Sequence, residues 1–219
     1  MGKTDLTLYF IMGSMNAEKP LSVLEDALKG GVTCFQFREK GPRALVGMEK
    51  RAFAESCQRL CRQFGVPFIV NDDVDLALEM DADGVHVGQD DAEARFAREK
   101  IGADKIVGVS VHTVEEARRA MMDGADYVGM GPVYQTSSKD DAKPVAGTTM
   151  ITVVGKLFPD LPIVGIGGIT AENADAVFEA GASGLSVISA IATAMDPELA
   201  ARRLRKAALR SMYGRRAVR

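Results

Sequence analysis

The sequence predicts a (β/α)8 barrel, and three features of the chain point to this fold. Short apolar runs alternate with segments of helical periodicity, and eight such units follow one another. The runs are apolar at nearly every position, which is typical of strands buried on both faces, as in a parallel sheet. A chain of 219 residues suits a compact barrel better than a doubly wound sheet. We therefore expect one barrel domain over residues 1–219.

The expected elements are bounded by glycines and small-residue turns. Gly30, Gly31 and Gly65 follow helical segments and are typical C-terminal signals. Strands are expected at residues 8–12, 32–37, 67–70, 82–87, 106–109, 125–130, 162–166 and 182–187. Helices are expected at residues 20–28, 43–64, 74–80, 92–100, 114–122, 148–158, 171–180 and 197 to about 208.

A glycine-rich segment tests the alternative of a dinucleotide-binding sheet. Residues 165–168 read Gly-Ile-Gly-Gly, which is close to the fingerprint of that fold. Thr170, however, stands where the last glycine belongs, and the segment follows the seventh strand instead of the first. The segment therefore favours the barrel.

The composition disfavours several classes of function. The net charge of −3 gives no general attraction to nucleic acid or an anionic membrane, and the absence of tryptophan disfavours a base-stacking surface. No run of about 18 apolar residues occurs, so no membrane span is expected. Three cysteines favour a reducing, cytoplasmic location over a disulfide framework. The basic stretch 202–219 is interpreted as a solvated helix face and frayed tail, and a homo-oligomer remains open.

Acidic residues follow two neighbouring strands. Asn71, Asp72 and Asp73 end the third strand, and Asp91 lies in the loop after the fourth. Since parallel strand ends meet at one end of a barrel, Asp72 and Asp91 could bind a hard divalent cation there. Taken alone, these carboxylates are better explained as helix caps.

Basic residues are expected at the same end. Arg38 and Lys40 follow the second strand, and Lys139 lies in the long connection 131–147. Cations beside two carboxylates suit a pyrophosphate group with Mg²⁺, which takes its remaining ligands from phosphate and water. A rim of ion pairs with Glu39 and Asp140 explains the charges as well.

A second anion site is expected after strands seven and eight. Gly167 and Gly168 open a turn, and glycine backbones with helix N-termini commonly bind phosphate at this place in a barrel. The alternative is a tight turn only. His86 and His112 are the only histidines, and no nucleophile–base spacing accompanies them.

These motifs together resemble the thiamine phosphate synthase family, particularly its bacillus members. The resemblance covers nearly the whole chain in family order. It rests on the segments 36–40 (Gln-Phe-Arg-Glu-Lys), 71–73, 88–91, 108–110, 129–132, 165–169 and 187–189.

The resemblance implies a Mg²⁺-dependent transferase with two small-molecule substrates. It would join 4-amino-2-methyl-5-pyrimidinylmethyl diphosphate to a phosphorylated methylthiazole, giving thiamine phosphate and pyrophosphate. Carried over residue by residue, Asp72 and Asp91 would bind Mg²⁺, and Gln36 would lie near the pyrimidine. The diphosphate would be held by Arg38, Lys40, Asn71, Ser110 and Lys139. The thiazole phosphate would be held by Thr136, Ser138, Gly168, Ile188 and Ser189.

One departure and two alternatives accompany this prediction. The family usually has Thr-x-Thr-Lys where this chain has Thr136, Ser137, Ser138 and Lys139, and serine keeps the hydroxyl. A related thiazole tautomerase would use a histidine after the fifth strand, here His112. A phosphate-ligand sensor without catalytic activity is the third possibility.

Overall fold

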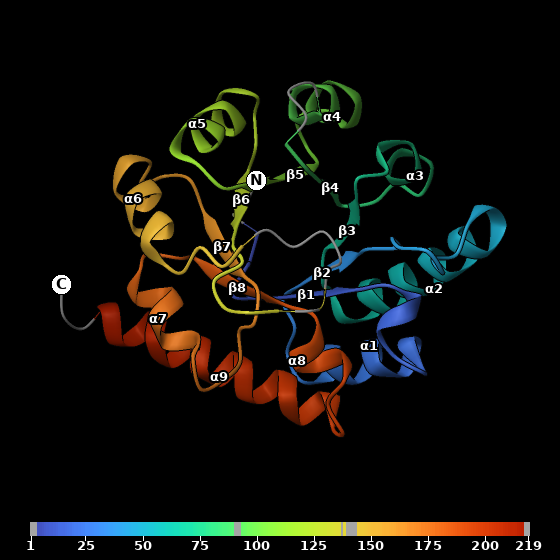
Figure 1. The fold of residues 1–219 in the computed structure, drawn as a ribbon. Coiled ribbons are helices and arrows are strands. Elements are labelled where there is room, and N and C mark those ends of the chain that lie inside the picture. The colour runs from blue at the N-terminus through green and yellow to red at the C-terminus, as the bar shows by residue number, and fades with distance from the viewer. Residues whose placement is uncertain (1–3, 90–92, 137, 139–143, 217–219) are drawn as a thin grey trace.

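The computed structural model describes residues 4–89, 93–136, 138 and 144–216. Eight parallel strands close into a barrel in sequence order, with helices around it (Figure 1). The predicted (β/α)8 fold is therefore confirmed. The strands are β1 (Leu8–Met12), β2 (Cys34–Phe37), β3 (Phe68–Asn71), β4 (Gly84–Val87), β5 (Ile106–Val111), β6 (Tyr127–Met130), β7 (Ile163–Ile166) and β8 (Gly184–Val187).

The helices mostly follow the predicted segments. They are η1 (Ser14–Asn16), α1 (Pro20–Lys29), α2 (Gly47–Phe64), α3 (Val74–Glu79), α4 (Glu93–Ile101), α5 (Val114–Met122), α6 (Thr149–Leu157), α7 (Ala174–Glu179), α8 (Ser189–Ala192) and α9 (Pro197–Arg216). The short helices η1 and α8 were not predicted. No helix in the part of the chain that the structure describes is long and apolar enough to cross a membrane.

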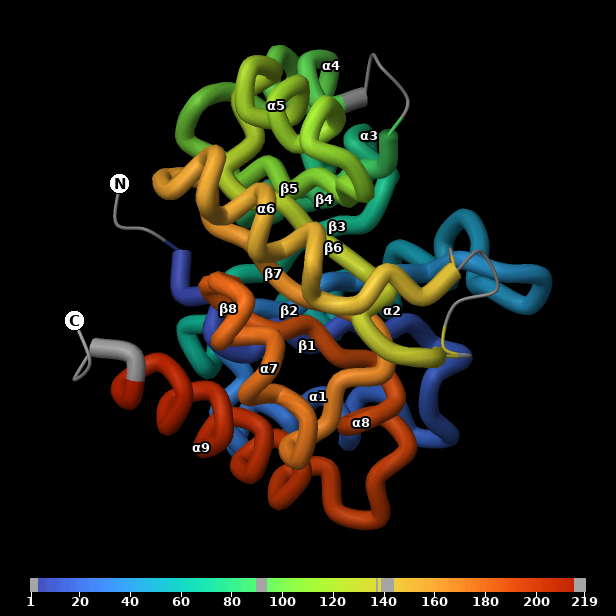
Figure 2. Tube along the Cα trace, turned by 60° about the vertical axis from the view of Figure 1, so that its left-hand side comes forward, coloured from blue at the N-terminus to red at the C-terminus, as the bar shows by residue number. Residues whose placement is uncertain are grey.

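Three predicted helix ends are wrong, and two of them belong to α2 and α9. The helix expected from residue 43 begins at Gly47, because Val46 is extended and Gly47 has a positive φ of 54°. The last helix continues to Arg216 and does not fray near residue 208. Its later turns are held against the barrel because Ala208 is fully buried and the Ser211 hydroxyl donates to Asp175 on α7. Figure 2 shows α9 lying along α7 and α1.

Side chains of the strands alternate between two packed layers. Outward residues such as Phe35, Phe68 and Val128 pack with the helices, and burying each such side chain stabilises the fold by about 1.5–3 kcal/mol. Inward residues such as Tyr9 and Tyr127 form a separate cluster inside the barrel. The inward layer therefore forms the floor beneath any site at the strand ends.

Glycines leave room for rings in this inward layer. Gly108 on β5 pairs in register with Tyr127 on β6, and a Cβ at Gly108 would lie 2.1 Å from Tyr127 Cζ. A Cβ at Gly129 would lie 3.4 Å from His86 Cε1. The barrel interior is thus shaped around two specific aromatic side chains.

Candidate active site

A cavity of about 800 Å³ opens at the carboxyl ends of the strands. Its walls come from the ends of β2 to β8 and the segments that follow them. This is the end at which barrel enzymes place their active sites.

Ten of the predicted site residues line this one cavity. They are Arg38, Lys40, Asn71, Asp72, Ser110, Thr136, Ser138, Gly168, Ile188 and Ser189. Gln36 is not in the cavity wall, because it is 1% exposed and its side chain bonds to Tyr9 inside the barrel. Asp91 and Lys139 lie outside the described residues.

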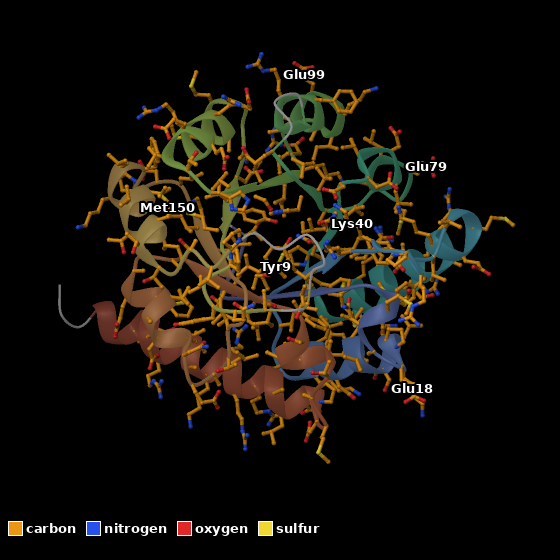
Figure 3. The ribbon with its side chains drawn as sticks, viewed as in Figure 1. Tyr9, Glu18, Lys40, Glu79, Glu99 and Met150 are labelled. Atoms are coloured by element: carbon orange, nitrogen blue, oxygen red, sulfur yellow. The ribbon has the colours of Figure 1, made fainter. Side chains whose placement is uncertain are left out.

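A cation and a carboxylate meet on the β2–β3 side of the cavity. Lys40 Nζ lies 3.3 Å from Asp72 Oδ2, and the two side chains are 52% and 44% exposed. Figure 3 shows Lys40 at this side of the rim and Tyr9 near the barrel axis. An exposed pair of this kind adds at most about 1 kcal/mol of stability. Its charges are therefore available to a bound molecule.

The backbone of Asp72 adopts an uncommon conformation. Its φ is +62°, in the left-handed region that aspartate tolerates better than most residues. The Asp72 N–H donates to the His86 carbonyl at 2.8 Å, which ties the end of β3 to β4. Residues with strained backbones are common at functional sites. Here the left-handed conformation keeps Asp72 outside the helix that follows.

Asp73 instead begins that helix. Its Oδ1 accepts from the Leu76 N–H at 2.9 Å, and its Oδ2 accepts from Lys50 Nζ at 2.6 Å. Partial burial opposes ionisation of Asp73, but the hydrogen bonds from Lys50 and Leu76 outweigh it and lower the pKa of the carboxyl. The prediction that Asp73 caps the next helix is confirmed, and Asp72 takes no part in this cap.

Glu39 fixes the loop that carries Arg38 and Lys40. Its carboxylate accepts from the Ser14 N–H at 2.8 Å, from the Ser14 hydroxyl at 2.6 Å and from the Leu45 N–H at 2.9 Å. It therefore ties the segment after β1 to the segment before α2. Asp140, the other acidic residue of the alternative with a rim of ion pairs, lies outside the described residues.

A chain of hydrogen bonds runs through the barrel to the cavity. Gln36 Nε2 donates to Tyr9 Oη at 2.9 Å, and Tyr9 Oη lies 2.7 Å from Tyr127 Oη. Tyr127 Oη lies 2.9 Å from His86 Nδ1, and His86 Nε2 lies 2.9 Å from Ser110 Oγ. Ser110 and His86 line the cavity.

The two tyrosines in this chain of hydrogen bonds are neutral. Burial raises the pKa of Tyr9 well above its usual value, and the neighbouring Tyr127 raises it further. Burial likewise raises the pKa of Tyr127. Each hydroxyl therefore keeps its single proton at physiological pH and can donate one hydrogen bond. His86 takes part in this chain through hydrogen bonds at both ring nitrogens.

The β7–β8 side of the cavity is built around two glycines. Gly167 and Gly168 have φ of 99° and 63°, and a Cβ at Gly168 would lie 2.5 Å from the Gln135 carbonyl oxygen. Glycine therefore lets this turn press against the segment that leads to Thr136. The Ser138 hydroxyl donates to Ser189 Oγ at 3.0 Å, which joins the loop after β6 to the end of β8.

The helix after this glycine turn begins later than predicted. α7 starts at Ala174, whereas residue 171 was expected. Asn173 occupies the intervening turn, since its side chain accepts from the Thr170 N–H at 2.8 Å and donates to the Gly168 carbonyl at 3.0 Å. The glycine turn is therefore held by an asparagine side chain before the helix starts.

Several residues of the site did not emerge from the sequence. Tyr9 and Tyr127 were overlooked, although strand alternation places them on the inward face. Ser186 on β8 was also overlooked. It contributes to the cavity wall and is 3% exposed, and its hydroxyl oxygen is the only buried side-chain N or O atom without a partner among the described residues.

A closed barrel with cations, a carboxylate and hydroxyls around one cavity defines a (β/α)8 enzyme suited to small anionic molecules. The profile of the family described as thiamine monophosphate synthase matches residues 8–191. The chain therefore belongs to this family, and it is a transferase.

Individual relatives agree with the family match. The chain is 62% identical to a thiamine-phosphate synthase of Geobacillus kaustophilus over 206 residues, covering 94% of this chain and 93% of the relative. It is 56% identical to that of Bacillus velezensis over 215 residues, covering 98% and 96%. Among solved structures, a thiamine phosphate pyrophosphorylase from Pyrococcus furiosus superposes with a TM-score of 0.84 at 33% identity, covering 96% of this chain and 98% of that one. The predicted family resemblance is confirmed.

Proposed function

We propose that the chain transfers the 4-amino-2-methyl-5-pyrimidinylmethyl group from its diphosphate to 4-methyl-5-(2-phosphooxyethyl)thiazole, with Mg²⁺. The products are thiamine phosphate and pyrophosphate. The observation that carries this proposal is one cavity with two polar sides. Arg38, Lys40 and Asp72 lie on the β2–β3 side, and Gly168 and Ser189 lie on the β7–β8 side. Two anionic groups of two substrates fit this arrangement.

The β2–β3 side would hold the diphosphate. Arg38 and Lys40 would neutralise its charge, and the amide of Asn71 and the hydroxyl of Ser110 would donate to its oxygens. Lys139, outside the described residues, is proposed as a third cation. These groups would stabilise the charge that develops on the leaving diphosphate.

The donor set on this side fits Mg²⁺. Asp72 offers a half-exposed carboxylate in the cavity wall that takes no part in capping α3. Mg²⁺ commonly binds one or two carboxylates and completes its octahedron with phosphate oxygens and water. Asp91, outside the described residues, is the second carboxylate we propose. The ion would supply further neutralisation of the diphosphate charge.

The β7–β8 side would hold the thiazole phosphate. Backbone N–H groups of the turn at Gly168 and of Ile188 and Ser189, with the hydroxyls of Thr136 and Ser138, are suitable donors to phosphate oxygens. Binding at both sides would align the thiazole nitrogen with the pyrimidine methylene. Such alignment can supply several kcal/mol of the barrier reduction.

The proposed chemistry is dissociative. The pyrimidine amino group pushes electrons toward the methylene, and the C–O bond to diphosphate breaks with its electron pair leaving on oxygen. The thiazole nitrogen then forms the new C–N bond to the delocalised cation. The chain's task is to neutralise the leaving group and hold the two rings in line, which matches the cations and donors of the cavity.

We further propose that the protein works in a reducing compartment, the cytoplasm. Cys34, Cys57 and Cys61 are free and buried, and burial raises the pKa of each thiol. Such thiols serve as packing residues.

Pyrophosphate release with each component omitted in turn tests the proposal. Release should require both substrates and Mg²⁺, and EDTA should abolish it. A tautomerase acting through His112 would convert a thiazole substrate alone and release no pyrophosphate. A sensor would bind phosphorylated ligands without turnover. Either result would overturn the proposal.

A further inference from the structure

Tyr127 does not line the cavity, yet its hydroxyl contacts a residue that does. Its ring is 1% exposed and does not line the cavity. Its hydroxyl lies 2.7 Å from Tyr9 Oη and 2.9 Å from His86 Nδ1. The hydrogen-bond route from Tyr127 to the cavity wall therefore passes through His86.

The donors of the chain can be assigned in order. The Gln36 amide nitrogen can only donate, so Tyr9 Oη accepts from it, and we assign the Tyr9 proton to the bond with Tyr127 because this keeps each hydroxyl proton bonded within the chain of hydrogen bonds. Tyr127 then gives its single proton to His86 Nδ1. A neutral histidine that accepts at Nδ1 carries its proton on Nε2. His86 Nε2 therefore donates to Ser110 Oγ.

This direction decides what Ser110 can do. Because its oxygen accepts from His86, its own proton is free to point at a molecule in the cavity. If His86 were protonated on Nδ1 instead, Nε2 would accept from Ser110 and would draw the serine proton away from the cavity. The proton that the Tyr127 hydroxyl donates to Nδ1 favours the Nε2-protonated form of His86 over the Nδ1-protonated form.

The packing supports a fixed position for both rings. A Cβ at Gly108 would lie 2.3 Å from Tyr127 Oη, so the space that holds this hydroxyl exists only beside a glycine. The Tyr127 ring packs edge-to-face on Tyr9 with centroids 5.8 Å apart, and lies 5.5 Å from the His86 ring. An apolar interior would have closed the barrel without these polar atoms, which points to a role beyond packing.

We propose that Tyr127 is a positioning residue that holds His86 in the Nε2-protonated form, so that Ser110 donates its proton to an anionic oxygen of the bound substrate. The identity of that substrate as the pyrimidinylmethyl diphosphate rests on the proposed function. The protonation state of His86 does not, because it can be measured in the free protein.

Nitrogen NMR of the protein with ¹⁵N-labelled histidine tests the first step. The chain has two histidines, and a His112→Gln variant assigns their signals. Wild type should show His86 protonated on Nε2, and Tyr127→Phe should shift His86 toward the Nδ1-protonated form. A His86 protonated on Nδ1 in the wild-type protein would overturn the proposal without any variant at Tyr127.

Tyr9→Phe is the matched control. It removes an equivalent buried hydroxyl from the same cluster but leaves the bond between Tyr127 and His86 in place. It should keep His86 protonated on Nε2. If Tyr9→Phe and Tyr127→Phe shift His86 equally, the hydroxyls act only through packing and the proposal is wrong.

Kinetics test the second step. Tyr127→Phe should lower kcat for pyrophosphate release about tenfold, which is less than the loss of a whole oxyanion donor. In a Ser110→Ala background, Tyr127→Phe should cause no further loss, because its effect passes through Ser110. Multiplicative losses would overturn the proposal. A wild-type enzyme that releases no pyrophosphate would instead refute the proposed function and leave the NMR result standing.

Discussion

The rim of the cavity carries exposed charged groups, whereas the interior beneath it carries buried neutral groups. At the rim, Lys40 and Asp72 are charged, about half exposed and 3.3 Å apart. In the interior, Tyr9 and Tyr127 are neutral and fully buried, with hydroxyls 2.7 Å apart. Exposed charges add little stability and are available to a ligand, whereas buried polar groups must be satisfied within the protein. Changes at the rim should therefore cost activity, and changes in the interior should alter geometry and stability.

The largest expected effect is on the charged residues proposed to hold Mg²⁺ and the diphosphate. Asp72→Ala and Lys139→Ala should each lower turnover about a hundredfold or more, the scale lost with one electrostatic donor. Thermal unfolding of Asp72→Ala should stay close to wild type. Steady-state pyrophosphate release and a melting curve check both expectations.

A second exposed ion pair supplies the control for the rim. Arg51 and Glu79 lie 2.8 Å apart on α2 and α3, outside the cavity wall. Glu79→Ala should leave turnover unchanged. Unchanged turnover in both Asp72→Ala and Lys139→Ala would refute the role of the rim.

The next effect concerns the turn on the β7–β8 side. Gly168→Ala forces an alanine into a φ of 63° and places its Cβ 2.5 Å from the Gln135 carbonyl oxygen. The backbone strain alone costs about 1–3 kcal/mol, and the displaced turn should raise the KM for the thiazole phosphate more than that for the diphosphate. Gly181→Ala, with a φ of 113° and no atom within 4 Å, should lose stability only. Equal KM values for Gly168→Ala and wild type would contradict this role.

A smaller effect is expected for Asp73, whose loss should lower stability and not turnover, in contrast to Asp72. Asp73→Ala should destabilise the protein by about 1 kcal/mol through loss of the helix cap, without a large effect on turnover. The folded-state pKa of Asp73 is lowered, so its ionic contribution is present above the unfolded pKa, near 3.9, and is lost as pH falls through the folded pKa. Urea unfolding of both proteins at neutral pH and below about pH 4 should show the difference shrinking. A difference that does not change with pH would show that the charge of Asp73 contributes nothing.

The smallest effect is expected at the one buried polar side-chain atom that has no partner among the described residues. The Ser186 hydroxyl oxygen is buried without a partner. Ser186→Ala should therefore leave stability unchanged or raise it by up to about 1 kcal/mol, because a buried unsatisfied group carries a desolvation penalty. Ser183→Ala, exposed immediately before the same strand, is the control. A loss of stability in Ser186→Ala alone would reveal a bonding partner for this hydroxyl.

The fold and the rim could be predicted from the sequence because both depend on local patterns. Continuous apolar runs located all eight strands, and position after a strand located Arg38, Lys40 and Asp72 at one end of the barrel. The start of α2 could not be predicted, since helical spacing continues through Val46 and only the backbone conformation at Gly47 shows the boundary.

The interior could not be predicted for a different reason. Tyr9 and His86 belong to strands separated by two others, and Tyr127 bonds with both. These hydrogen bonds depend on distances across the barrel and on the space beside Gly108. Neither quantity can be derived from the spacing of residues in the sequence. Gln36 shows the same limit, because its side chain bonds to Tyr9 beneath the cavity and does not reach the wall.

A crystal structure with Mg²⁺ and pyrophosphate tests the proposed roles of the rim and the interior together, since both meet at this ligand. We predict Mg²⁺ bound to Asp72 and to pyrophosphate oxygens, with Arg38 and Lys40 on the same group. Ser110 Oγ should lie within hydrogen-bond distance of a pyrophosphate oxygen while it still accepts from His86 Nε2. Pyrophosphate bound away from Asp72, or a Ser110 hydroxyl that donates to His86, would contradict the account.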